Sequence, residues 1–412
     1  MVRLITIAVL FCVSSASGQT TAPAPRVRPG VEVWAAHGFA PLAGKRIGLV
    51  TNATGVTSDL RSTIDVLHVA KEVRLVALFG PEHGVRGDVF GGQEVAGYTD
   101  ERTGLPVHSL YGKTRKPTPE MLKGLDALVY DIQDIGCRSY TYISTMGVAM
   151  EAAAEQGIDF VVLDRPNPLG GQKIEGRPGD PAFFSFIGRY PIAYVYGMTC
   201  GELALMIRGE GWLANGVKGA LHVVPMAGWR RGMRFADTGL PWVMTSPHIP
   251  TPEAAVLYAG AGILGELGVI NEGCGYTLPF QLFGAPWLKD GELADALAAR
   301  KLAGVRFRPI SYSPYYLSFK DQTCRGVQTY LTDFDGVDLT AIQFHVMDIV
   351  RTRHPSQRLF GRGRDDMFDK ACGTDRIRKA FAEGMPLEGI LAIWREGVDA
   401  FRARRSAYLL YE

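Results

Sequence analysis

The sequence predicts an α/β protein whose mostly parallel sheet is covered by helices on both faces. Short apolar runs of strand length alternate with segments of helical periodicity along the first half of the chain. Polar side chains directly follow four of these runs, as they do where parallel strands end at one edge of a sheet. The chain has 412 residues, which favours two domains over one.

The first residues have the charged, apolar and small-residue zones of a secretory signal. A basic start with Arg3 is followed by the apolar run Leu4–Val13 and by small residues up to Gly18. We therefore predict a signal peptide at residues 1–18 and an exported protein, periplasmic or secreted. About 10 apolar residues are far fewer than the roughly 20 that span a bilayer, so no transmembrane segment is expected. The Pro-rich residues 19–30 predict a flexible linker.

The composition excludes several classes of protein. Hydrophobic residues make up 47% and charged residues 21% of the chain, which is typical of globular domains with sizeable cores. The net charge of +2 gives no reason to expect nucleic acid or an anionic membrane as a partner. Besides Cys12, the five cysteines are scattered and odd in number, which excludes a full disulfide framework but not a single bridge. They lack the spacing of a metal site, so no metal is expected.

The fold is expected to begin near Val31 with a strand–helix–strand unit. Apolar runs at residues 46–51 and 73–79 predict its two strands, and helical periodicity predicts a helix over residues 58–69 between them. This order predicts parallel pairing, because the helix returns the chain to the same end of the sheet.

A second unit of the same kind follows. Residues 127–131 and 160–164 predict its strands, and the Ala-rich residues 145–156, closed by Gly157, predict the helix between them. Two such units in succession are typical of a doubly wound sheet with helices on both faces.

One more helix and strand complete the predicted sheet. Thr199 and Glu202 have the spacing of a capping box, which marks the start of a helix that we expect to run through Arg208. The apolar residues 221–225 then predict another strand.

Three prolines among residues 245–252 predict a rigid crossing between domains, because each proline fixes its own backbone and restricts the residue before it. The expected boundaries are residues 31–245 for a catalytic first domain and 246–412 for the second. The last helix is predicted over residues 387–401, where apolar side chains recur on one face. We expect the basic residues 402–405 to form a solvated end.

The side chains that follow the predicted strands are the first candidate site residues. Because the carboxyl ends of parallel strands lie at one edge of a sheet, these side chains are expected to meet there. In chain order they are Asn52, Glu82, His83, Asp131, Gln133, Asp134, Asp164, Arg165 and Asn167.

One connection is unusually long. The segment from residue 80 to residue 119 far exceeds the median of about 4–6 residues for connections inside compact domains. It carries the polar residues Arg86, Asp88, Gln93 and Glu94 among several glycines. Since long connections tend to be functional or disordered, we predict that this one covers the substrate.

Paired carboxylates at strand ends suit the cleavage of a glycoside, in which one group protonates the leaving oxygen and another acts as base, nucleophile or cation stabiliser. Glu82 is the first candidate for the acid, beside His83, which is suited to orient or polarise it. Asp131 and Asp134 are the candidates for the second group. Structural alternatives remain open, since Glu82 can cap a helix or pair with Arg86 and either aspartate can bond loop amides.

Further candidates follow Asp134 along the chain. Arg138, Tyr140 and Tyr142 offer a guanidinium and two phenols, which suit a carboxylate and a sugar face, although tyrosines also pack in ordinary cores. In the segment from Asp164 to Asn167, prolines hold a polar cluster rigid, and a purely structural turn is the alternative.

Several common motifs point away from other classes of enzyme. Residues 260–265 match GxGxxG, but Gly268 cuts the helix short and no acidic residue follows about 20 positions on, so no nucleotide cofactor is expected. The sequence contains no GxSxG elbow, P-loop or HExxH motif. These absences argue against an α/β-hydrolase, a P-loop NTPase and a zinc protease.

The ordered motifs resemble those of the NamZ-type exo-β-N-acetylmuramidases over nearly all of the chain. In the first domain they are residues 48–55 (GLVTNATG), 79–87 (FGPEHGVRG), 131–136 (DIQDIG), 140–145 (YTYIST), 163–168 (LDRPNP) and 197–202 (GMTCGE). In the second they are residues 246–253 (SPHIPTPE), 284–287 (GAPW), 324–327 (CRGV) and 408–411 (YLLY).

This resemblance implies a Rossmann-like first domain without a nucleotide, a smaller α/β C-terminal domain and an active-site cleft between them. It implies hydrolysis of non-reducing terminal N-acetylmuramic acid from peptidoglycan fragments, as in cell-wall turnover and recycling. The proposed catalytic glutamate of the family's PEHG motif corresponds to Glu82. The lactyl carboxylate of muramic acid gives a reason for Arg86, Arg138 or Arg165 near the site.

The chain departs from the family pattern in one segment. Where the family has TNVSEGRGTTRPF, residues 268–280 are GVINEGCGYTLPF, without the two arginines. Glu272 in this segment is a candidate for substrate binding. The alternatives to a muramidase are therefore an exported glycosidase of altered specificity, a non-catalytic periplasmic binder of cell-wall sugars, and an exported esterase or amidase.

Overall fold

The computed structural model describes residues 27–87 and 97–412. The predicted signal peptide and all but the last residues of the predicted linker lie outside the described residues. The same holds for Asp88, Gln93 and Glu94 of the predicted substrate-covering connection.

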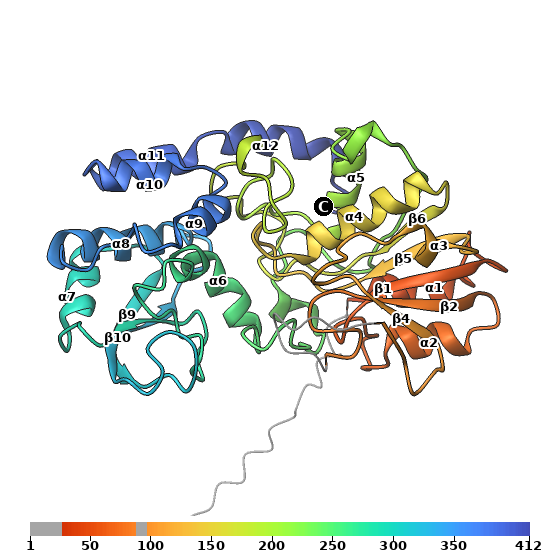
Figure 1. Ribbon diagram of the computed structural model, residues 1–412, viewed down its shortest axis with the longest axis horizontal. Helices are drawn as coiled ribbons and strands as arrows, with labels where there is room; N and C mark the ends of the chain where they lie inside the picture. Colours follow the sequence, from red (N-terminus) through yellow and green to blue (C-terminus); the bar gives the residue numbers. More distant parts are fainter. Residues whose placement is uncertain (1–26, 88–96) are drawn as a thin grey trace, which may run out of the picture.

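The first domain is built on a seven-stranded sheet (Figure 1). Its spatial order is β3-β4-β2-β1-β5-β6-β7, and neighbouring strands pair in parallel except β3 with β4. The predicted mostly parallel sheet is therefore confirmed. The strands are β1 (Arg46–Thr51), β2 (Arg74–Gly80), β3 (Tyr98–Thr99), β4 (Pro106–Ser109), β5 (Ala127–Asp131), β6 (Asp159–Leu163) and β7 (Leu221–Val224).

Helices cover both faces of this sheet, as predicted. On one face α1 and α2 pack Trp34 and Leu67 against Leu49 of β1. On the other face α3, α4 and α5 share a core with Val50, the next residue of the same strand, because successive side chains of a strand point to opposite faces. These helices are α1 (Gly30–Ala36), α2 (Thr63–Val69), α3 (Pro119–Leu122), α4 (Tyr142–Glu155) and α5 (Cys200–Gly209).

Most element boundaries lie near the predicted ones. β1 and β5 occupy the predicted residues, β2 and β6 are each shifted by one residue, and β7 ends one residue early. Helix α2 begins at Thr63 rather than at residue 58, because the side chain of Ser62 accepts a hydrogen bond from the backbone N–H of Ile64 and caps the helix there.

The capping box predicted at the start of α5 is confirmed. The hydroxyl of Thr199 accepts from the backbone N–H of Glu202, and the carboxylate of Glu202 accepts from the backbone N–H of Thr199. By contrast, the glycines of residues 260–265 lie inside a helix rather than in a strand-to-helix loop. This placement gives no phosphate-binding turn.

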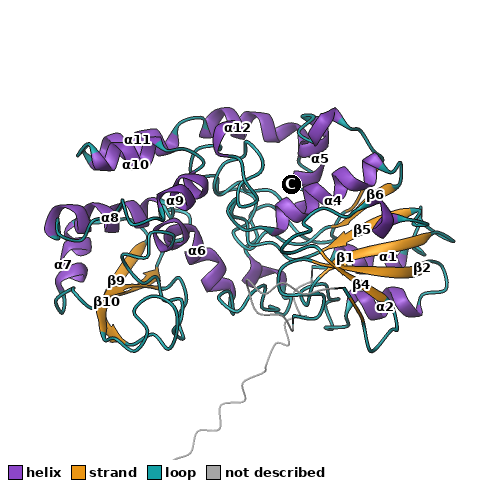
Figure 2. Ribbon diagram, in the orientation of Figure 1, coloured by secondary structure: helices purple, strands orange, loops and turns teal. Residues whose placement is uncertain are grey.

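The second domain is smaller and contains an antiparallel sheet of order β8-β10-β9 (Figure 2). Its core also contains Ile135 and Tyr194 of the first domain, so apolar packing is continuous across the domain boundary. Its elements are α6 (Pro252–Gly265), β8 (Leu282–Ala285), α7 (Glu292–Ala299), β9 (Val305–Tyr312), β10 (Cys324–Leu331), α8 (Ala341–Arg353), α9 (Asp365–Cys372), α10 (Arg376–Ala382) and α11 (Leu387–Arg395).

The chain end corrects two predictions. Instead of one helix over residues 387–401, α11 and α12 (Val398–Arg405) are separate, because Gly397 adopts a positive φ of 75° that a continuing helix does not allow. The end of the basic run is not solvated, since Arg405 is buried and donates to the carbonyls of Gly171 and Gly197. Helix α12 places Phe401 in the core of the first domain.

Three more features concern the described residues as a whole. Short 3-10 segments are η1 (Pro181–Phe183), η2 (Ala214–Gly216), η3 (Phe235–Thr238) and η4 (Ser406–Tyr408). The five cysteines from Cys137 to Cys372 are buried and free, so this part of the chain contains no disulfide. Its helices are all too short or too polar to cross a bilayer.

Candidate active site

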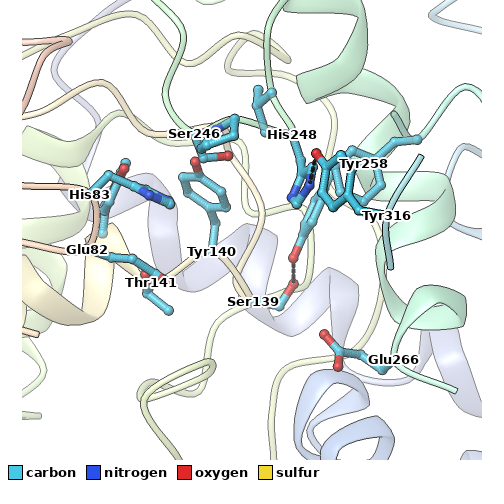
Figure 3. Close-up of a pocket in the computed structure, with 14 residues that line it drawn as sticks. Glu82, His83, Ser139, Tyr140, Thr141, Ser246, His248, Tyr258, Glu266 and Tyr316 are labelled. Atoms are coloured by element: carbon cyan, nitrogen blue, oxygen red, sulfur yellow. Dashed lines mark hydrogen bonds between the residues drawn. The ribbon is translucent and has the colours of Figure 1, made fainter. Parts of the chain in front are cut away.

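A cavity of about 640 Å³ lies between residues of the two domains (Figure 3). Its volume is within the range of about 300–1,000 Å³ that is usual for small-molecule sites. The lining comes from the turn after β2, the segment that enters α4, the proline-rich crossing, α6 and two loops of the second domain. The lining residues are Glu82, His83, Ser139, Tyr140, Thr141, Tyr142, Ser246, Pro247, His248, Ile249, Tyr258, Glu266, Phe280 and Tyr316.

Glu82 and His83 lie on a tight turn at the carboxyl end of β2. The backbone N–H of Gly84 donates to the carbonyl of Pro81 at 3.0 Å and closes the turn. His83 adopts a positive φ of 75°, which costs a residue with a side chain about 1–3 kcal/mol and is commonest at functional sites. Both side chains face the cavity, and the imidazole of His83 points toward Tyr140.

Tyr140 and Tyr142 form the wall beside Glu82. Tyr140 donates to the hydroxyl of Thr245 at 2.9 Å, Tyr142 donates to the carbonyl of Thr245 at 2.5 Å, and the two rings meet edge to face with centroids 4.9 Å apart. Burial raises the pKa of Tyr142 well above its usual value, and the charges of Tyr140 and Glu82 add to the rise. Both phenols therefore stay neutral and fix the first domain to the proline-rich crossing.

Hydroxyl groups form hydrogen bonds along the cavity, one between the two domains and one within the second. Ser139 shares a hydrogen bond of 2.9 Å with the hydroxyl of Tyr258 on α6, and His248 shares one of 2.9 Å with Tyr316 (Figure 3). Burial, with a smaller contribution from His83, lowers the pKa of His248. The His248 ring is therefore favoured in its neutral form within the cavity.

Asp131 and Arg165 lie away from the cavity. Asp131 is fully buried and accepts two hydrogen bonds from Arg165, at 2.5 and 2.9 Å, and one from Thr63 at 2.5 Å. These three bonds engage both carboxylate oxygens with protein partners, and Asp131 is absent from the lining of the cavity. The prediction of Asp131 as a second catalytic carboxylate, and of Arg165 as a substrate ligand, does not fit this arrangement.

Asp134 and Gln133 are also buried beneath the site rather than in its lining. Asp134 accepts from the hydroxyl of Tyr196 and from the backbone N–H of Gly136 at 2.7 Å, and burial raises its pKa to about 6. Gln133 donates to the carbonyls of Asp134 and Pro166. The structure therefore gives both side chains a role in holding the strand-end loops.

The remaining strand-end candidates bond their own loops or neighbouring segments, since Asp164 accepts from Thr199 and Tyr411 and Asn167 donates to the carbonyl of Met198. Asn52 accepts from the backbone and hydroxyl of Thr54, and Asn167 accepts from the backbone N–H of Leu169. Asp164 is buried, and burial raises its pKa to about 6. The hydrogen bonds of these residues match the structural alternatives, and none of the three side chains lines the cavity.

The two other candidate arginines are committed to protein partners. Arg86 forms a two-point pair with Asp100 at 2.7 and 2.9 Å, so it does not pair with Glu82, and its hydrogen bonds lower the pKa of Asp100 to about 2. Arg138 is buried and donates to four backbone carbonyls. Neither side chain lines the cavity.

The sequence did not single out the wall that the second domain provides. Glu266 at the end of α6 lines the cavity. The predicted ligand Glu272 does not line it and lies beside Gly265 instead. Figure 3 shows Glu266 on the side opposite Glu82, with its carboxylate directed toward Ser139. Two signals in the sequence point to this wall. They are the rigid segment 245–252, which leads into the cavity, and the long apolar helix α6, which ends at Glu266.

Comparison with known proteins gives agreement over both domains. The family models described as exo-beta-N-acetylmuramidase NamZ, N-terminal and C-terminal, match residues 47–253 and 256–411. The chain is 45% identical over 395 residues to the peptidoglycan beta-N-acetylmuramidase NamZ of Bacillus subtilis (strain 168), which covers 96% of this chain and 94% of that protein.

Two crystal structures of DUF1343 family proteins from Bacteroides fragilis NCTC 9343 share the fold. One has a TM-score of 0.90 at 51% identity and covers 95% of this chain and 100% of its own. The other has a TM-score of 0.76 at 31% identity and covers 94% of this chain and 99% of its own. The arrangement of both domains is therefore common to these proteins.

Proposed function

This chain belongs to the NamZ family of exo-β-N-acetylmuramidases, and we propose that it hydrolyses N-acetylmuramic acid from the non-reducing ends of peptidoglycan fragments, with Glu82 as its catalytic acid. The observation that carries this function is the position of Glu82. It lies on a turn in which the next residue, His83, has an unfavourable backbone conformation, and its side chain faces a cavity between the two domains that is large enough to hold a sugar.

The chemistry follows from this position. Glu82 gives its proton to the glycosidic oxygen, the bond between this oxygen and C1 breaks, and water adds to C1 and releases a proton. His83 lies next to Glu82 in the same lining. The neutral phenols of Tyr140 and Tyr142 offer a flat surface for the sugar ring.

The test is hydrolysis of a chromogenic β-glycoside of N-acetylmuramic acid. We expect the wild-type protein to release the chromophore and Glu82→Gln to lower kcat by about 10²- to 10⁴-fold, the usual contribution of a general acid. Equal rates for both proteins would show that Glu82 is not the acid. Saturable binding of a muramic acid disaccharide without product would instead support the non-catalytic binder.

Export is a separate proposal that rests on the sequence of residues 1–18. The charged, apolar and small-residue zones of this segment support it. Sequencing of the mature N-terminus after expression in a bacterial host is expected to find Gln19 first, and a protein that keeps Met1 and stays in the cytoplasm would contradict export.

A further inference from the structure

Glu266 presents a carboxylate to the cavity from the second domain, on the side opposite Glu82 (Figure 3). We propose that Glu266 accepts a hydrogen bond from the 4-hydroxyl of the terminal sugar and thereby restricts the enzyme to chain ends. The proposal rests on the function proposed above and names a residue that determines its specificity.

The position of Glu266 is unfavourable for stability. It is the C-cap residue of α6, where the unpaired carbonyls of the helix repel a negative charge. Glu272 packs against Gly265, directly before it, and adds a second acidic group. Burial raises the pKa of Glu266 to about 6, the charge of Glu272 adds to the rise, and Arg364 partly offsets it.

Other titratable groups near Glu266 offer no compensation. Tyr258 and Cys274 both have pKa values that burial raises and that the charge of Glu266 raises further. The fold therefore keeps a half-buried carboxylate at a place where the helix end, the burial and the neighbouring acidic group all disfavour its negative charge. Residues of this kind are typical of ligand-binding sites, because their cost in stability is offset only by the interactions that they make with the ligand.

The geometry of a sugar ring connects Glu266 with Glu82. In a pyranose, C4 lies across the ring from C1, so a sugar with C1 beside Glu82 directs its 4-hydroxyl toward the opposite wall. Two other polar side chains of the lining are engaged with protein partners, since Ser139 bonds Tyr258 and Tyr140 bonds Thr245. Glu266 is the acidic side chain of the lining on that wall.

A carboxylate at this place distinguishes a chain end from an internal residue. At a chain end the 4-hydroxyl carries a hydrogen that it donates to the carboxylate. Inside a chain the same oxygen is glycosidic, has no hydrogen, and would place its lone pairs against those of the carboxylate. A buried polar group left unpaired in this way rejects the wrong ligand strongly.

The experiment compares two substrates, the chromogenic β-glycoside of N-acetylmuramic acid and its 4-deoxy analogue. We expect the wild-type protein to have a kcat/KM about 10- to 100-fold lower for the 4-deoxy substrate, the usual effect of a lost hydrogen bond to a charged group. In Glu266→Ala, kcat/KM for the normal substrate falls by a similar factor, and the difference between the two substrates disappears. Glu82→Gln lowers both rates and keeps their ratio.

A matched control lies on the same helix. Glu253 is an exposed acid in the first turn of α6, outside the cavity, where a negative charge is favourable. Glu253→Gln is expected to keep both rates and to lower the melting temperature slightly, whereas Glu266→Gln raises it by a few degrees.

Two outcomes separate the possible failures. If Glu266→Ala still discriminates against the 4-deoxy substrate, or if Glu266→Gln melts earlier than wild type with both rates reduced equally, Glu266 has only a structural role and the inference is wrong. If the wild-type protein cleaves neither substrate, the proposed function itself fails.

Discussion

Arg138 shows how a single buried residue joins the two domains. Its guanidinium donates to the carbonyls of Arg177 and Ile192 in the first domain and of Ala371 and Cys372 at the end of α9. Burial lowers its pKa to about 10, so it remains charged at neutral pH. The five donors of arginine suit this role, because they satisfy carbonyl groups from several directions at once.

We predict that Arg138→Met destabilises the protein by about 3–5 kcal/mol, because four buried carbonyls lose their donors. Urea unfolding measures this change. The exposed Arg402 pairs with Asp399, and Arg402→Met is expected to change the unfolding free energy by less than about 1 kcal/mol. Equal effects of both substitutions would contradict a joining role for Arg138.

The same residue shows a limit of sequence analysis. A guanidinium near a predicted site suggests a partner for the substrate carboxylate, and the sequence does not reveal that backbone carbonyls more than 200 positions away use it instead. The same reason explains why Arg86 and Arg165 do not line the cavity as predicted. Arg86 forms an ion pair with Asp100, and Arg165 forms one with Asp131. Partners that are distant in sequence decide which charged groups remain free.

At the scale of elements, local patterns were reliable where they described backbone. β1 and β5 have the predicted bounds, and the capping box of α5 was identified from two residues. The break between α11 and α12 was missed, because apolar side chains keep the same spacing across Gly397. A glycine with positive φ ends a helix without changing the apolar pattern around it.

Helix α6 shows that the tertiary position of a residue decides whether it can contact a ligand. In the sequence Glu266 is one acidic residue directly after a long apolar segment that contains the GxGxxG glycines. In the structure, α6 follows the proline-rich crossing, and its end directs Glu266 into the cavity. The function of this residue depends on how two domains meet.

At the scale of the whole molecule, the chain end stabilises the first domain. The hydroxyl of Tyr411 donates to Asp164 at 2.6 Å, and the backbone N–H of Leu410 donates to Glu202 at 2.8 Å. The C-terminus lies beside α4 and α5 in Figure 1. The strand-end carboxylate Asp164 thus helps to hold the C-terminal residues against the first domain.

Stability is expected to depend on pH through the buried carboxyls. Asp134 and Asp164 have pKa values of about 6 in the folded protein against 3.8 in the unfolded chain, so the folded state binds their protons more tightly. Their contribution to stability is present below about pH 4 and is lost as the pH rises through 6. For each group the loss is about 3 kcal/mol at most.

The difference between wild type and Asp134→Asn isolates one of these groups. We predict that the stability of the variant relative to wild type increases by about 2–3 kcal/mol between pH 4 and pH 7. The reason is that the wild type loses the stabilisation from the protonated Asp134 as the pH rises, whereas asparagine does not titrate. Urea midpoints at both pH values measure it. A difference that is independent of pH would show that Asp134 titrates normally.

The sequence by itself determined the parallel sheet, its strand ends and the turn that carries Glu82, because these depend on residues that are neighbours along the chain. Only the tertiary structure decided that Glu82 and His83 face a cavity while Asp131, Asp134 and Asp164 are buried with internal partners. It also placed Glu266 opposite them. The physical reason is that a polar group is free for a ligand only when the folded chain leaves it unsatisfied, and its partners come from distant parts of the sequence.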